Sequence, residues 1–500
     1  MLLVWAPPLA APAWLAPQTG TLPPQLVERL ERWRRHEAAE LRRREIDRLN
    51  FRTLRAAALR APQDTVNPPV ASTVVEGDTV KHIRVATSGS CSSYAEITTV
   101  VRAKGTNGIF LEDVANPTGF LVSDFTSFSQ TFDTKIFPNL VAEFGSPGDA
   151  DHNGRVVLVV TKEVNKAGGG ELGFVTSCDL FSRDVSPASN GGEFTYLVAP
   201  DPNGTVNSGF KYSRTAAFRD IPDLISHEPV HIIQFTRRQA LGADMVSIWL
   251  AEGQAVLGEE VVGDTIEGHT TGQNTLGFKE AVNLDDTTST DFFGLPFSAL
   301  GLYFGWDPEV TLDTHLDTAP WECTWLGENY GGPCVEGVEP YGAPWALLRY
   351  ISDRFGNGNP GEANLQKAII DNTLDGYALV QSVTGVRIDS LLAQFSAMLF
   401  VDDSVTAAAP QLQEKSWNLH DVFYGTFLFG GRQVGLRPAL RLTPVPLTFT
   451  TFSKSANVRA ASAFYAGVTG GNRPATAIKA RDAAGGILPS HMRYWVVRLQ

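Results

Sequence analysis

A short pattern, His-Glu-x-x-His, constrains the fold of this chain more than any other feature. It lies in the stretch SHEPVHIIQF and comprises His227, Glu228 and His231. On a helix, residues four apart lie on one face, so the two imidazoles can reach one metal ion while Glu228 faces a water molecule beside it. The pattern therefore predicts a helix whose histidine face is turned toward a metal ion.

A second stretch, WLAEGQA, supplies the ligand that the two histidines lack. A catalytic zinc ion takes three protein ligands and a water molecule, and in one large class the third ligand is a glutamate on the next helix. Glu252 follows His231 by 21 residues, and Gly253 beside it permits close packing of a second helix. We predict that Glu252 completes a zinc site with the two histidines. Glu259 and Glu260 are expected on the surface or behind the ligands.

Together the two stretches resemble the gluzincin zinc metallopeptidases, and within them the hyicolysin-like neutral metallopeptidases. A looser likeness extends to FPNLVAEFGSPGDADHNGRVVLVVT upstream and to YGAPWALLRYISDRFG and SVTGVRIDSLLAQFSA downstream, so it covers about residues 130–400. The resemblance implies that His227, His231 and Glu252 are zinc ligands and that Glu228 is the general base of a peptide-bond hydrolase. It also implies an α+β fold with a zincin-like body, made of a mixed β-sheet subdomain and a mainly helical one.

Pro229 is the departure from this family, which usually has a bulky apolar residue such as Phe at that position. A proline removes the helical hydrogen bond to the carbonyl of Ile225, at a cost of about 3 kcal/mol. Zinc binding is worth about 10 kcal/mol or more in structural sites, so we expect a kinked helix that still holds the ion. Proline also disfavours helical geometry at the preceding residue, so Glu228 is the residue most at risk.

Two functions are therefore open. The first is a zinc-dependent endopeptidase that hydrolyses peptide bonds in extended protein or peptide substrates. The alternative is a catalytically impaired zincin-fold protein that acts as an extracellular binding protein, and Pro229 is the only feature of the sequence that favours it.

Peptide hydrolysis also requires a group that stabilises the developing oxyanion. Related gluzincins carry a tyrosine at the head of a similar helix, and the resemblance implies Tyr341 in this role, with His315 as a second candidate. Packing beside Pro340 is the alternative for Tyr341, and a surface loop is the alternative for His315. The stretch YLVAP, residues 196–200, fits either an edge strand that pairs with substrate or an ordinary core strand.

The stretch DADHNG raises the question of a calcium site. Asp149, Asp151 and Asn153 alternate before Gly154, as in the first half of an oxygen-rich calcium loop. Position twelve of such a loop is Val160 rather than a glutamate, which excludes an EF-hand. The two remaining interpretations are a Ca²⁺ site at these residues and an Asx-rich turn that leads into a strand.

Basic residues gather near the N-terminus, although the whole chain has a formal net charge of -13. Residues 28–60 contain 11 Arg against 6 acidic residues, with no Gly or Pro. The apolar stripe is incomplete and consists of Leu26, Leu30, Trp33, Leu41 and Leu49. We predict an amphipathic helix that is either a pro-segment lying over an acidic catalytic domain or a solvated arm. The acidity of the remainder disfavours a nucleic-acid partner.

The cysteines and the chain start bear on the compartment. The four cysteines lack C-x-x-C spacing, which favours disulfides over a thiolate metal site, and Cys323 and Cys334 bracket a short Gly-rich loop. The first residues, MLLVWAPPLAAPAWLAPQ, are apolar like a signal peptide but lack a basic start. The sequence has no run of about 18 apolar residues that could span a membrane. We expect a monomer that is secreted or lies on the exterior of the cell envelope.

The composition changes along the chain divide it into four parts. Short β-branched runs predict a β-rich N-terminal subdomain, spacings of three and four predict a helical subdomain with the zinc site, and Thr/Val/Phe alternation predicts a C-terminal all-β module resembling a sandwich. The expected boundaries are 1–70 for the signal-like stretch and basic helix, 71–215 for the β-rich part, 216–428 for the helical part and 429–500 for the β-module.

Overall fold

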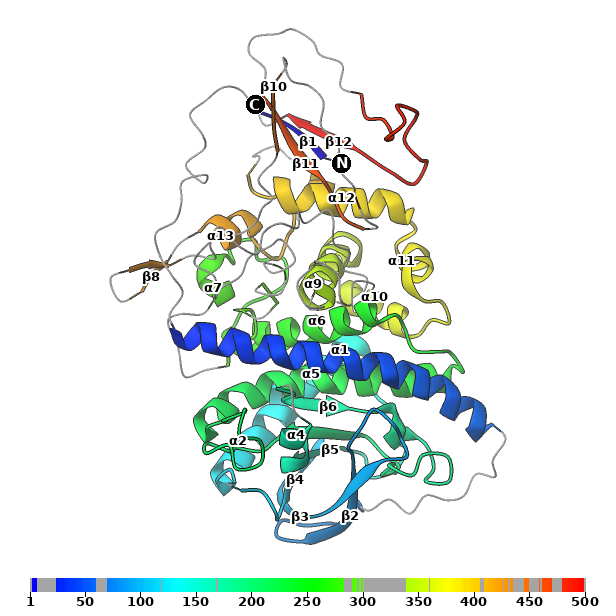
Figure 1. The fold of residues 1–500 in the computed structure, drawn as a ribbon, viewed down its shortest axis with the longest axis vertical. Coiled ribbons are helices and arrows are strands. Elements are labelled where there is room, and N and C mark those ends of the chain that lie inside the picture. The colour runs from blue at the N-terminus through cyan, green and yellow to red at the C-terminus, as the bar shows by residue number, and fades with distance from the viewer. Residues whose placement is uncertain are drawn as a thin grey trace.

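The computed structural model has a mixed α+β fold in which a curled mixed sheet lies beside a layered helical half (Figure 1). The residues it describes are 2–6, 24–59, 70–117, 119–167, 170–282, 290–294, 296–297, 300, 339–358, 360–404, 409–425, 427–429, 432–434, 445–448, 458, 461–469 and 479–498. All statements below concern these residues.

The larger sheet has six strands, in the order β2-β3-β4-β5-β7-β6. Their bounds are β2 Thr79–Ala86, β3 Tyr94–Lys104, β4 Gly108–Asp113, β5 Val156–Thr161, β6 Gly173–Val175 and β7 Phe194–Val198. Strands β4, β5 and β7 are parallel to one another, and the remaining pairs are antiparallel. The predicted strands in EITTVVRA, RVVLVVT and EFTYLVAP are all present. Every residue of β5 and β7 is buried, which accounts for their continuous apolar sequences.

Strand β7 contains the first three residues of YLVAP, and it lies inside the sheet rather than at its edge. The interpretation of this stretch as a substrate-pairing edge strand is therefore wrong, and the core-strand interpretation holds. The edge is formed by the short strand β6, which pairs antiparallel with β7. Strand order follows from tertiary pairing, and the alternation of residues within one strand does not specify it.

Short helices connect the strands. They are α2 Val122–Thr131, the π-helical turn η2 Phe132–Ile136, α3 Phe137–Phe144, α4 Lys162–Lys166 and the 3₁₀ turn η3 Ser177–Leu180. The helical spacing of TFDTKIFPNLVAEFG is thus confirmed, with Phe132, Ile136, Leu140 and Phe144 all buried. These apolar side chains belong to the same core as the inner strands.

The helical half is built on two long helices, α5 Arg214–Ala240 and α6 Ile248–Glu267, which pack against each other. A Cβ atom at Gly258 of α6 would lie only 2.7 Å from the side chain of Val230, so glycine permits the close approach of α5. Further helices pack beyond α6 (Figure 1). These are α7 Phe278–Val282, α9 Glu339–Ile351, η5 Ser352–Gly356, α10 Gly361–Ile370, α11 Gly376–Thr384, α12 Ile388–Val401, η6 Pro410–Leu412 and α13 Leu419–Tyr424.

The basic N-terminal segment forms one helix, α1 Pro24–Ala58, as predicted. Figure 1 shows α1 crossing the molecule beside α5 and α6, at the level where the sheet meets the helical half. Trp33 and Leu41 of the predicted stripe are buried, whereas Leu49 is 61% exposed; the side chains of Leu26 and Leu30 lie outside the described residues. The helix is therefore packed onto the body along much of its length and is not a solvated arm.

The C-terminal strands form a four-stranded parallel sheet in the order β10-β11-β1-β12. Strands β10 Val445–Thr448, β11 Tyr465–Thr469 and β12 Trp495–Arg498 come from the predicted β-module, and β1 Leu2–Ala6 comes from the stretch predicted to be signal-like. A separate antiparallel pair consists of β8 Phe427–Phe429 and β9 Arg432–Val434. The described strands show a sheet shared by both ends of the chain, and a C-terminal sandwich stays a prediction.

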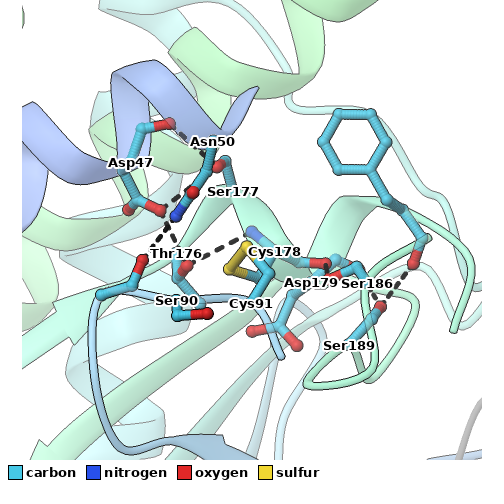
Figure 2. Close-up of a disulfide and its surroundings, with 12 residues drawn as sticks. Asp47, Asn50, Ser90, Cys91, Thr176, Ser177, Cys178, Asp179, Ser186 and Ser189 are labelled. Carbon is cyan, nitrogen blue, oxygen red and sulfur yellow. Dashed lines mark hydrogen bonds between the residues drawn. A yellow bond between two sulfur atoms is a disulfide. The ribbon is translucent and has the colours of Figure 1, made fainter. Parts of the chain in front are cut away.

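A disulfide joins Cys91, in the turn after β2, to Cys178 in η3, which confirms that cysteines of this chain pair (Figure 2). Beside it, Thr176 donates a hydrogen bond to Asp47 of α1, with 2.9 Å between Oγ1 and Oδ1. The disulfide therefore fixes the turn against which α1 rests. Cys323 and Cys334 lie outside the described residues. Among the helices that the structure describes, none is both long and apolar enough to cross a membrane.

We expect peptide mapping of the unreduced protein to show Cys91 linked to Cys178. The two cysteines already lie in bonding geometry, and disulfides persist in oxidising compartments. Mass spectrometry of the digest with and without reductant checks this. Recovery of Cys91 linked to Cys323 or Cys334 would contradict the structure.

Candidate metal centre

The His-Glu-x-x-His stretch lies in the middle of α5, which is one continuous helix despite containing both Pro222 and Pro229. The helix begins after Ser213, whose side chain accepts a hydrogen bond from the backbone of Ala216. All residues from Asp223 to Thr236 are buried. The proline therefore does not end the helix. The packed residues on every side keep the chain helical although one backbone hydrogen bond is missing.

The three predicted ligand side chains converge. The Nε2 atoms of His227 and His231 are 3.2 Å apart, and Glu252 Oε2 lies 3.3 Å from the first and 3.4 Å from the second. A tetrahedral ion with ligands about 2.0–2.1 Å away separates any two of them by about 3.3 Å. The three atoms thus already have the mutual spacing that such an ion requires.

A second layer of side chains orients both imidazoles. His227 Nδ1 lies 2.5 Å from Glu259 Oε1, and His231 Nδ1 lies 3.0 Å from Gln234 Oε1. With Nδ1 facing an acceptor, each ring can carry a proton there, which leaves Nε2, the nitrogen on the side of Glu252, available to a metal ion. Gln234 is itself held by α6, since it donates to the carbonyl of Ala251. The arrangement is the one that metal-binding histidines generally have.

Glu259 and Glu260 are both buried rather than on the surface, and Glu259 lies behind a ligand. Glu259 contacts His227, as described, and Glu260 accepts hydrogen bonds of 2.7 Å from the indole nitrogens of Trp345 and Trp417. The position of Glu259 follows from the helix period, because it lies seven residues after Glu252 on the same face of α6. The helical spacing of Glu252 and Glu259 could therefore have predicted that Glu259 lies next to the ligands.

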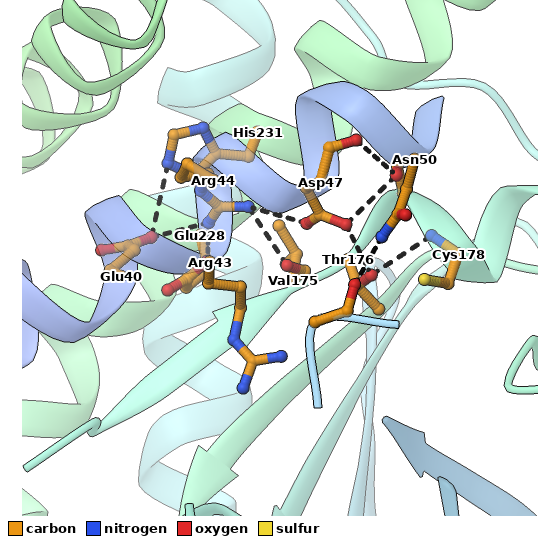
Figure 3. Close-up of polar contacts among 12 residues, drawn as sticks. Glu40, Arg43, Arg44, Asp47, Asn50, Val175, Thr176, Cys178, Glu228 and His231 are labelled. Atoms are coloured by element: carbon orange, nitrogen blue, oxygen red, sulfur yellow. Dashed lines mark hydrogen bonds and ion pairs between the residues drawn. The ribbon is translucent and has the colours of Figure 1, made fainter. Parts of the chain in front are cut away.

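Two side chains from α1 complete the centre, and no sequence pattern marked them. Glu40 Oε2 lies 3.6 Å from His227 Nε2, and Glu40 Oε1 lies 3.7 Å from His231 Nε2. Arg44 Nη2 donates to Glu40 Oε1 at 2.6 Å and to Glu228 Oε2 at 2.8 Å (Figure 3). Arg44 Nε is also 3.4 Å from Glu252 Oε1.

The charges of the centre favour a cation. Burial and the nearby Glu40 carboxylate raise the pKa of Glu228 well above its usual range. Burial opposes a proton on His227, yet the surrounding carboxylates, Glu40 first, raise its pKa well above the usual value. Burial and Arg44 lower the pKa of His231, which favours the neutral ring that metal binding needs. The carboxylates that stabilise a proton on His227 would also stabilise a divalent ion at the same place.

The residues present fit a metal ion. Atoms of Glu40, His227, His231 and Glu252 all lie within 4.8 Å of one another, and all four residues are buried. Neither carboxylate oxygen of Glu252 has a hydrogen-bond partner, so its buried charge is in contact only at ion-pair distances of 3.3–3.4 Å, with the two imidazoles and Arg44. Imidazole nitrogens combined with carboxylate oxygens are a donor set that zinc accepts. The group can therefore hold a metal ion.

The other predicted site residues are only partly described. Tyr341 lies within α9, Glu339–Ile351, but its side chain is outside the described residues, as is all of His315. Their roles as oxyanion stabilisers stay predictions.

The turn before β5 is Asx-rich. The backbone of Asn153 donates to Asp151 Oδ1 at 3.0 Å, and its side-chain amide donates to Asp151 Oδ2 at 2.6 Å. Asn153 Oδ1 accepts from the backbone of Arg155, so this oxygen is already used within the turn. The residue that joins Asp149 and Asp151 as a possible cation ligand is Glu193 instead. Ca²⁺ binding here stays a prediction, with Glu193 in place of Asn153.

Comparison with protein-family models and with curated proteins adds no relative. No protein-family model matches this chain, and no curated protein matches it. The likeness to gluzincins therefore rests on the residues of α5 and α6.

Loss of a ligand should remove the metal, and loss of its support should weaken binding. We expect about one zinc ion per chain, loss of that ion on His227→Ala, and about tenfold or greater weakening on Glu259→Gln, because the charge that orients His227 is removed. Elemental analysis and competition with a chromophoric chelator measure both. Glu45→Gln, at an exposed position of α1, is the matched control. Unchanged zinc content in His227→Ala would refute the site.

Proposed function

We propose that this chain is a zinc-dependent endopeptidase of the gluzincin type. The observation that carries the proposal is the convergence of His227, His231 and Glu252 at tetrahedral spacing, with Glu228 on the same helix. Three protein ligands from two packed helices are the donor set of catalytic zinc sites that keep a further position for water. Zinc is the proposed ion because the donors are imidazole and carboxylate.

When bound, the metal would polarise the scissile carbonyl and lower the pKa of the attacking water. The remaining work falls to Glu228. It takes the proton from water as the oxygen attacks the carbonyl carbon, and it delivers that proton to the amine nitrogen as the C–N bond breaks.

The continuity of α5 supports a role for Glu228 in spite of Pro229. The carboxylate of Glu228 reaches the same guanidinium, Arg44, that contacts Glu252, so it lies beside the ligand set. The alternative of an impaired zincin-fold binding protein would need Glu228 displaced from the centre, and this contact argues against displacement.

An extended protein or peptide substrate fits the edge of the larger sheet. Among the described strands, β6 pairs with β7 on one side and is unpaired on the other. The chain from β6 to η3 runs beside α1 and the metal centre. A substrate strand added to β6 would pair by main-chain hydrogen bonds. The Cys91–Cys178 disulfide supports export to an oxidising compartment, so we place the enzyme outside the cell or on its envelope.

Substitution Glu228→Gln tests the proposal. In a chain that carries Arg44→Ala, which removes the contact of α1 with Glu228, we expect Glu228→Gln to lower casein hydrolysis by about a factor of 10² or more, since general base catalysis contributes at least that much, while zinc content stays unchanged. Hydrolysis measured on dye-labelled casein, with zinc determined on the same samples, separates catalysis from metal loss. Glu45→Gln serves as the control.

The absence of hydrolysis would count against the enzyme only under defined conditions. Zinc must be bound, and the contacts of Glu40 and Arg44 must have been removed by substitution. A chain that holds zinc and cleaves no casein in that state supports the binding-protein alternative.

A further inference from the structure

Helix α1 buries charges against the metal centre. Glu40, Arg44 and Asp47 are all at most 2% exposed, and His36 is 1% exposed. The helix also buries the apolar side chains of Trp33, Leu41, Phe51 and Leu54, but its buried ions are unusual, because a desolvated ion costs several kcal/mol unless it is paired. Here the pairing partners are the residues of the proposed catalytic centre.

We propose that α1 is an inhibitory segment, in which Glu40 occupies the open metal position and Arg44 sequesters the general base Glu228. The proposal rests on the proposed function, because it assigns the regulation of that same site. It selects the pro-segment interpretation of the basic helix over the solvated arm and names the contacts that act.

The first contact concerns the metal. Glu40 approaches both ligand imidazoles, with Oε2 3.6 Å from His227 and Oε1 3.7 Å from His231, so its carboxylate lies close enough to the three ligands to supply a fourth. Its carboxylate is an acceptable zinc ligand in its own right. With Glu40 in this position, the water that would attack the substrate has no site on the metal.

The second contact concerns the base. Arg44 donates at 2.8 Å to Glu228 and lies 3.4 Å from Glu252. With its Oε2 atom engaged by this buried guanidinium, the Glu228 carboxylate is held by α1 instead of being free to contact a water molecule at the metal position. Arg44 is fixed in turn by Glu40 at 2.6 Å, so the two α1 residues act as a pair four residues apart.

The third contact concerns the substrate edge. Arg44 Nη1 donates to the carbonyl of Val175 in β6 at 3.1 Å, and the backbone of Leu172 donates to His36 Nδ1 at 3.1 Å. Asp47 accepts from Thr176 and Ser177, the residues that follow β6 (Figures 2 and 3). Two main-chain groups at this edge, the carbonyl of Val175 and the amide of Leu172, are thus engaged by side chains of α1.

Neighbouring contacts place α1 in register. Arg43 forms a two-pronged pair with Glu171, at 2.6 and 2.9 Å, and lies 3.7 Å above the ring of Phe174. Nearer the start of the helix, Arg29 pairs with Asp291 at 3.3 Å. Water can solvate these charges once α1 separates from the body of the protein. Such polar contacts are typical of interfaces between parts of a chain that move relative to each other.

The test compares full-length Glu40→Gln and Arg44→Ala with the parent chain. Each is loaded with Co²⁺, whose visible absorption depends on its ligands, and titrated with acetohydroxamate, which binds an open metal position. We expect a changed Co²⁺ spectrum in Glu40→Gln and about tenfold or tighter acetohydroxamate binding in both variants, because a blocked site lowers apparent affinity by the fraction that is open. Casein hydrolysis should rise in parallel.

Two variants at exposed positions of α1 serve as controls for this test. Glu45→Gln and Arg42→Ala, at exposed positions of the same helix, should behave like the parent. Parent and Glu40→Gln with equal spectra and equal acetohydroxamate affinity would overturn the proposal, whatever the hydrolysis. A changed spectrum and tighter binding without hydrolysis in either variant would uphold the block and refute the endopeptidase. If Glu40→Gln fails to retain metal, Arg44→Ala decides through acetohydroxamate affinity.

Discussion

The excess of buried carboxylate around two imidazoles is the constraint on which the centre depends. Four buried carboxylates lie within reach of the two imidazoles or of the guanidinium of Arg44. They belong to Glu40, Glu228, Glu252 and Glu259. A buried ion costs several kcal/mol unless it is paired, and like charges in one place raise that cost. Arg44 offsets part of this charge, and without a metal the raised pKa values of His227 and Glu228 show that bound protons offset more of it. A divalent cation between the imidazoles relieves the repulsion, which is the physical reason to expect one.

Rigid surroundings make the spacing of the ligands meaningful. The glutamine chain from Gln234 through Gln254 to Gln366 ties α5, α6 and α10 together by side-chain hydrogen bonds. On the far side, Glu260 is held between two indoles. Each link fixes a helix that carries a ligand or the partner of a ligand. The site is therefore preorganised by contacts that do not themselves touch the metal.

The sequence predicted the parts of the structure that depend on local periodicity. The ligand pair on α5 and Glu252 on α6 followed from helical spacing, and β3, β5 and β7 followed from their β-branched runs. It failed where distant segments meet. The alternation in YLVAP is the same in an edge or a core strand, so the position of β6 outside β7 was not predictable. Glu40 and Arg44 look like any i,i+4 pair of a solvated helix, and only their tertiary partners distinguish them.

Metal binding and the seating of α1 are thermodynamically coupled through Glu40. Without a cation, the Glu40 carboxylate adds a negative charge to a pocket that already contains Glu228 and Glu252, and this repulsion works against α1. With a cation present, the same carboxylate becomes a ligand and holds α1 in place. Because linkage is reciprocal, whatever the ion adds to the seating of α1, α1 adds to the affinity for the ion. On the proposal made above, a chain that folds with α1 in place would both retain its metal and keep the open position closed until the helix is displaced.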